Sequence, residues 1–158
     1  MQYKVDKIKQ IVADYCLQNE GITVQNTTDS AGNECLEWQS SLMLEVLSED
    51  DRESKKSLSR QSVFVQFDIS FNIKNKKIIV FLQWGKIEPV LWEAAQPQIV
   101  REIKREGNVN IRFYKERQVV EIGLVYPFHE FDFLYVYKEI ISHFGFVNGI
   151  FFRKANEK

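Results

Sequence analysis

Cysteine, histidine and proline are scarce in this chain, which has two cysteines, two histidines and three prolines among 158 residues. Cys16 and Cys35 are too few to form the disulfide framework of a small secreted domain. We therefore expect a cytoplasmic protein with reduced thiols. Each cysteine should pack as a small buried or half-buried hydrophobic side chain and not as a nucleophile.

Long apolar runs and an excess of either charge sign are also missing. No stretch approaches 18 uncharged apolar residues, and the opening MQYKVDKIKQ lacks the apolar core of a signal peptide. Basic and acidic residues number 21 and 22, so no net positive field attracts nucleic acid or an anionic membrane. We expect neither nucleic acid nor a membrane as a partner.

Basic residues nevertheless gather in two places: Lys74, Lys76 and Lys77 in one predicted turn, and Lys104 with Arg105 at a predicted helix end. Such groups beside aromatic strands are a feature of surfaces that bind single-stranded nucleic acid. Because acidic residues cancel them overall, we interpret them as solvated turn residues and as charges that complement a helix dipole.

Motifs for nucleotide binding and acyl transfer are absent. The seven glycines form no dinucleotide-binding fingerprint, and no Gly-Lys-Ser or Gly-Lys-Thr is present for a phosphate loop. No serine lies in a Gly-x-Ser-x-Gly elbow. The sequence therefore predicts no cofactor and no catalytic serine.

Two constellations of ionisable residues remain. Glu139 and His143 are four residues apart on a predicted helix and could share a metal with a third ligand, but this spacing equally describes an ordinary helix-surface pair, and we expect no metal site. Glu88 has apolar neighbours, including Trp84 and Trp92, as a general acid requires. Starting a helix ahead of Pro89 is the simpler role, so we expect no catalytic residue.

Hydrophobic periodicity predicts the secondary structure. Alternation is strongest from Val63 to Ile73, where six successive odd positions are apolar. The predicted elements, in chain order, are a helix over 3–18, a hairpin over 22–28 and 34–46, a mobile charged loop over 48–61, a hairpin over 63–73 and 77–84, a turn over 89–95, a helix over 97–106, a hairpin over 109–113 and 120–126, and a helix over 132–144.

Several boundaries rest on single residues. Residues 42–52 could also form a helix, and Pro97 divides the segment after Pro89 because proline disrupts a helix interior. Gly145 ends the last helix, and the apolar tail after it should pack as a short strand or extended arm. The final residues, 154–158, should fray.

Together these elements predict one α+β domain over 1–158, in which an antiparallel sheet carries helices on one face. The order is helix, three to four strands, helix, two strands, helix. Helices that lie between hairpins, and not after every strand, favour this class over a parallel sheet.

Aromatic side chains are abundant, with 12 Phe, 6 Tyr and 3 Trp. Together they offer more apolar area than three short helices are expected to cover, and exposed apolar surface marks a site for a protein partner or a second copy of the chain. The candidate partner-binding residues are Trp84, Trp92, Phe146 and Phe151. The alternative, which we weigh equally, is that these side chains fill the core.

The order of elements resembles that of type III secretion chaperones and of the related YbjN family of small bacterial proteins. The segments that carry the resemblance are the amphipathic first helix, the strands FVQFDISFNI and KKIIVFLQW, the helix from Pro89, the hairpin VNIRFYKERQVVEIGLVY and the helix FDFLYVYKEIISHF. The resemblance implies a non-enzymatic, often dimeric protein that binds a partner segment through apolar grooves.

Three hypotheses of function follow. The first is a cytoplasmic, homodimeric protein-binding module that holds a protein partner by apolar and strand-edge contacts. The second is a toxin-neutralising immunity protein. The third is a small ligand-binding domain or hydrolase centred on Glu88 and Trp92.

Overall fold

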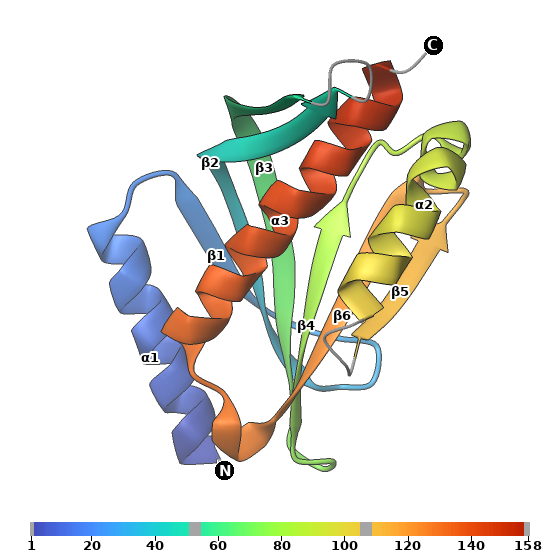
Figure 1. The fold of residues 1–158 in the computed structure, drawn as a ribbon. Coiled ribbons are helices and arrows are strands. Elements are labelled where there is room, and N and C mark those ends of the chain that lie inside the picture. Colours follow the sequence, from blue (N-terminus) through green and yellow to red (C-terminus); the bar gives the residue numbers. More distant parts are fainter. Residues whose placement is uncertain (1, 51–54, 105–108, 157–158) are drawn as a thin grey trace.

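The computed structural model describes residues 2–50, 55–104 and 109–156, with the backbone alone for 44–50 and 55–61 (Figure 1). Within these ranges the elements are α1 (Gln2–Gln18), β1 (Ile22–Thr28), β2 (Glu34–Asp50), β3 (Lys55–Asn72), β4 (Lys77–Trp84), α2 (Pro89–Ile103), β5 (Val109–Tyr114), β6 (Val119–Pro127), the short 3-10 helix η2 (Phe128–Glu130) and α3 (Phe133–Asn156).

The strands form one six-stranded sheet in the order β1-β2-β3-β4-β6-β5, and every pair is antiparallel. The three long helices lie on the same face of this sheet, with α3 crossing its middle, α1 beside β1 and α2 on the β5 side (Figure 1). The predicted α+β class and the order of its elements are confirmed.

Along the strands, apolar side chains alternate with other side chains, and the apolar ones on the helix-covered face form the core. The odd positions of β3 from Val63 to Phe71 are buried, while Phe64 on the opposite face is exposed. Trp38 of β2 stacks on Phe67 with ring centroids 5.2 Å apart, and Phe133 of α3 covers Trp38 at 5.7 Å. Because one face buries aromatic rings and the other does not, the register of the strands is strongly specified.

The segment predicted as a charged loop is paired strand on both of its described sides. β2 and β3 stay in register as far as Asp50 and Lys55, so their ends form a two-stranded ribbon that extends past the rest of the sheet. In this register Glu49 is paired with Lys56 and Asp50 with Lys55, and residues of opposite charge at paired positions favour antiparallel pairing. The loop prediction for 48–61 is wrong for these residues, and 51–54 lie outside the described ranges. The helical alternative for 42–52 is likewise wrong as far as Asp50.

The division of the segment after Pro89 is also wrong, because α2 is a single helix with Pro97 inside it. Pro97 and Glu93, whose carbonyl loses its helical donor, are both exposed, so water can solvate that carbonyl. Ala95, Ile99 and Ile103 are buried on the opposite side of the helix. Packing on that side outweighs the cost of the proline.

The last helix is longer than predicted. Gly145 does not end α3, which continues to Asn156 and buries Val147, Ile150 and Phe151 along the same stripe as Phe144. A glycine inside a helix costs only about 1 kcal/mol, and burial of these apolar side chains exceeds that cost. The predicted extended arm is therefore wrong. Of the end predicted to fray, residues 154–156 belong to α3, and residues 157–158 lie outside the described ranges.

Candidate functional site

The outer edge of β1 is the first feature of interest. β1 is an outermost strand of the sheet and pairs only with β2 in the part of the chain that the structure describes. Its sequence, ITVQNTT, has no charged residue and no proline. Natural proteins usually protect such an edge with charges, prolines or bulges, because its free backbone groups can pair with another strand. β1 carries neither charge nor proline.

A groove of about 780 Å³ runs between this strand and α1. On the helix side, Asp6, Gln10, Ala13 and Leu17 recur every three or four residues and so share one face, and Lys9, Val12 and Cys16 line the groove beside them. On the strand side it is lined by residues of β1, with Leu36 of β2 contributing from the sheet. The groove is therefore mostly apolar toward the C-terminal end of α1.

Aromatic packing fixes α1 in this position. The ring of Tyr15 lies 6.0 Å from that of Trp38 and 5.1 Å from that of Tyr137, and Val5, Ile8 and Val12 of the same helix are buried. Leu17, two residues after Tyr15 and on another side of the helix, is 86% exposed and lines the groove. Its isobutyl side chain therefore contributes little to the core.

The charges at the groove are few and lie on the α1 and β2 side. Lys9 of α1 forms an ion pair with Glu34 at the start of β2, with 3.4 Å between Nζ and Oε1, and Gln2 donates a hydrogen bond to Asp6. Burial raises the pKa of the Cys16 thiol, so this groove residue is neutral at pH 7. The chain thus offers a neutral groove beside an uncharged strand edge.

Two of the four predicted partner-binding residues lie in the core. Trp84, at 5% exposed, packs against Phe144 with ring centroids 4.5 Å apart, and Phe151 is also buried. The indole Nε1 of Trp84 has no hydrogen-bond partner among the described residues. These two side chains therefore fill the core, as the alternative interpretation predicted, because α3 continues as a helix over the sheet and covers them.

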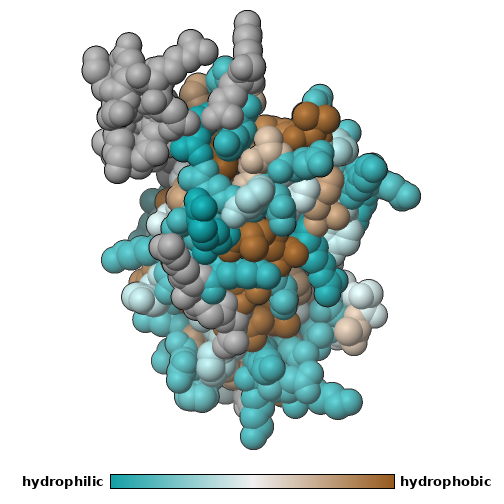
Figure 2. All heavy atoms as spheres, turned by 45° about the vertical axis from the view of Figure 1, so that its right-hand side comes forward, coloured by the Kyte–Doolittle hydropathy of each residue, from teal (hydrophilic) through white to brown (hydrophobic). Residues whose placement is uncertain are grey.

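The other two keep part of their surface. Trp92 is half-buried and stacks on Phe113 at 5.6 Å, while Phe146 is 38% exposed on α3. Figure 2 shows apolar residues down the middle of one side of the molecule, in patches bordered by hydrophilic residues. The structure does not bring the four predicted residues together into one apolar site.

The remaining candidates are separate from the groove. Glu88 is the N-cap residue of α2, as its simpler predicted role required, although its side chain makes no capping hydrogen bond. It is exposed, so it lacks the apolar setting that a general acid requires. Glu139 accepts a hydrogen bond from Tyr126, and His143 is buried. Among the described residues, no group of three or more His, Cys, Asp or Glu side chains is placed to hold a metal ion.

Cys16 and Cys35 are half-buried and buried, as predicted. The groove itself was missed by sequence reasoning, because it depends on where α1 lies relative to β1. No local signal marked it, because Leu17 lies on the side of α1 away from the buried stripe of Val5, Ile8 and Val12.

Comparisons of the chain with models of protein families, with curated proteins and with solved structures found no match. No helix in the described ranges has both the length and the apolar character needed to cross a bilayer.

Proposed function

We propose that the protein is a non-enzymatic binding module that holds an extended segment of a protein partner at the edge of β1. The observation that carries the proposal is the unprotected edge of this strand, which lies beside a neutral, largely apolar groove. The resemblance to secretion chaperones supports the same reading, since those proteins bind partner segments through apolar grooves.

The proposed mode is β-strand addition. The partner segment pairs with the outward-facing backbone groups of β1, and every second side chain enters the groove against α1. The groove has apolar side chains from both elements, such as Leu17 and Val24, so apolar residues at alternate positions of the segment fit it best. Backbone pairing supplies affinity, and the groove supplies selectivity.

Affinity capture from the native cells, followed by mass spectrometry, tests the proposal with three versions of the protein as bait. Leu17→Glu places a carboxylate at the groove at little cost to folding, because Leu17 is 86% exposed. Val90→Glu is the matched control: Val90 is 76% exposed on α2 and does not line the groove. We expect the partner to be captured by wild type and by Val90→Glu, and lost from Leu17→Glu.

Amide hydrogen exchange with a peptide from the captured partner locates the contact. Protection of β1 amides from Ile22 to Thr28 is expected, since a paired strand shields them. A partner that binds Leu17→Glu as well as wild type would refute the groove. A strict monomer by light scattering, with no partner captured, would refute the binding module itself. A dimer that Leu17→Glu dissociates would identify a second copy of the chain as the occupant.

A further inference from the structure

The face of the sheet opposite the three long helices is uncovered in the part of the chain that the structure describes (Figure 1). On this face the strand register places Glu37 of β2 beside Asp68 of β3, and Asp68 beside Phe81 of β4. Phe81 is in turn paired with Gly123 of β6, and Glu121 lies two residues before Gly123 on the same face. Glu37, Asp68, Phe81 and Glu121 are called the open-face patch.

The carboxylates of this patch repel one another. Burial, followed by the charges of Glu37 and Glu121, raises the pKa of Asp68 to about 6, and Gln83 donates a hydrogen bond to it. Neither Glu37 nor Asp68 forms an ion pair with a described basic residue, and Arg112 at the β5 edge is paired with Glu121. Like charges opposite each other lower the stability of a sheet, and a cation between them relieves the repulsion. The middle of this face is therefore complementary to a positively charged partner.

An aromatic ring lies beside these carboxylates. Phe81 is half-buried, and its ring lies against Gly123, where a Cβ atom would come within 3.5 Å of the ring atoms Cδ1 and Cε1. The absence of a side chain at Gly123 thus leaves room for the ring on this face. A guanidinium group stacks on an aromatic ring and forms paired hydrogen bonds with a carboxylate, which an ammonium group does not. The patch therefore suits arginine better than lysine.

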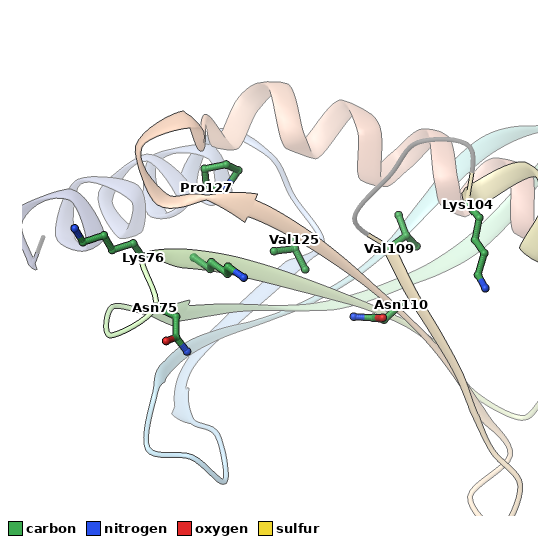
Figure 3. Close-up of a pocket in the computed structure, with 8 residues that line it drawn as sticks. Asn75, Lys76, Lys104, Val109, Asn110, Val125 and Pro127 are labelled. Atoms are coloured by element: carbon green, nitrogen blue, oxygen red, sulfur yellow. The ribbon is translucent and has the colours of Figure 1, made fainter.

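The spread of the patch indicates a partner with several cationic groups. Its carboxylates come from β2, β3 and β6, and β2 and β6 are three strand spacings apart, about 14 Å. A single small cation cannot contact carboxylates over that span, whereas an extended peptide with several basic side chains can. The lysines of this chain do not supply these charges, because Lys76, Lys77 and Lys104 line a separate pocket that shares no residue with the patch (Figure 3).

We infer that the open-face patch docks an arginine-rich segment of a protein partner, with guanidinium groups paired to its three carboxylates and one of them stacked on Phe81. The inference is independent of the proposed function, since no residue of the patch lines the groove beside β1.

A hexa-arginine peptide is the probe, titrated into the isotope-labelled full chain and followed by amide chemical shifts. We expect saturable shifts at residues 35–39, 66–70, 79–83 and 121–123, and weaker binding as salt screens the charges. Hexalysine should bind about threefold more weakly or worse, because it neither forks to carboxylates nor stacks as well. Affinity should fall as the pH is lowered through about 6, because Asp68 then takes up a proton.

Variants decide whether the patch is responsible. Glu37→Gln with Asp68→Asn should weaken binding of hexa-arginine about tenfold or more and remove most of its pH dependence. Glu88→Gln with Glu93→Gln is the matched control, because it removes the same charge from exposed positions at the start of α2. No saturable shift at millimolar peptide, shifts centred on another face, or equal loss in the control would overturn the inference. Phe81→Leu keeps the charges and should lower the affinity for hexa-arginine to that for hexalysine. Equal binding of the two peptides by wild type would overturn the preference for arginine.

Discussion

Two adjacent rows of residues cross the sheet, one position apart along each strand and on opposite faces. They differ in the polarity of their side chains. The row on the helix-covered face consists of Trp38, Phe67, Leu82, Ile122 and Ile111. The row on the other face consists of Gln39, Gln66, Gln83, Glu121 and Arg112. The first is an apolar layer under the helices, and the second is polar throughout. A shift of one residue in any strand would exchange the two environments, so this contrast fixes the register.

The largest effect should come from truncating an aromatic residue on the covered face. Trp38 is fully buried against Phe67 and Phe133. Trp38→Ala should lower the free energy of unfolding by about 3 to 5 kcal/mol, because it removes apolar contacts and leaves a cavity. Phe64→Ala is the matched change on the other face, where Phe64 is 55% exposed, and it should cost about 0.5 kcal/mol or less. Equal losses in denaturant unfolding would contradict the contrast between the faces.

A smaller effect, of opposite sign, is expected from Asp68 on the polar face. Burial, with the charges of Glu37 and Glu121, raises the pKa of Asp68 to about 6, while a hydrogen bond from Gln83 opposes the shift. The folded protein therefore binds more protons than the unfolded chain between about pH 4 and about pH 6, and its stability falls as pH rises through that window.

Asp68→Asn should remove this dependence. We expect the variant to be more stable than wild type by about 1 to 2 kcal/mol at pH 8, after allowance for solvent screening of a half-buried group, and the gain to vanish below about pH 4. Denaturant unfolding across this pH range measures it. Glu93→Gln, at an exposed position of α2, is the control for the loss of one carboxylate. A gain that persists unchanged at low pH would rule out an electrostatic origin.

The smallest effect should come from the ion pair that joins α1 to the start of β2. Lys9 and Glu34 are 3.4 Å apart and partly exposed, and pairs of this kind contribute about 0 to 0.5 kcal/mol. A double-mutant cycle with Lys9→Ala and Glu34→Gln should give a coupling energy in that range. A coupling above about 1.5 kcal/mol would mean that charge, and not apolar burial alone, holds α1 on the sheet.

Much of the fold follows from local patterns. The alternation from Val63 to Phe71 identified β3 and its buried face, and the spacing of Val5, Ile8 and Val12 identified α1. These predictions succeeded because a strand and a helix each repeat their buried side with a fixed period. The patterns were misleading where a single residue was given too much weight, as at Pro97 and Gly145, because packing on the buried side of α2 and α3 outweighs one unfavourable residue.

The candidate sites followed much less directly. Trp84 and Phe151 were chosen as surplus apolar residues, yet their burial depends on how far α3 extends over the sheet. The groove beside β1 was not foreseen, because it depends on where α1 lies relative to β1 and not on the sequence of either element alone.

By itself the sequence determined the class of the fold, the buried face of most strands and the absence of the common nucleotide and acyl-transfer motifs, since each depends on residues near one another in the chain. Only the tertiary structure decided that β1 is an outer strand beside a groove, and that Glu37, Asp68 and Glu121 share one patch. The physical reason is that strand order and helix placement are set by the packing of the whole apolar core, which no local period encodes.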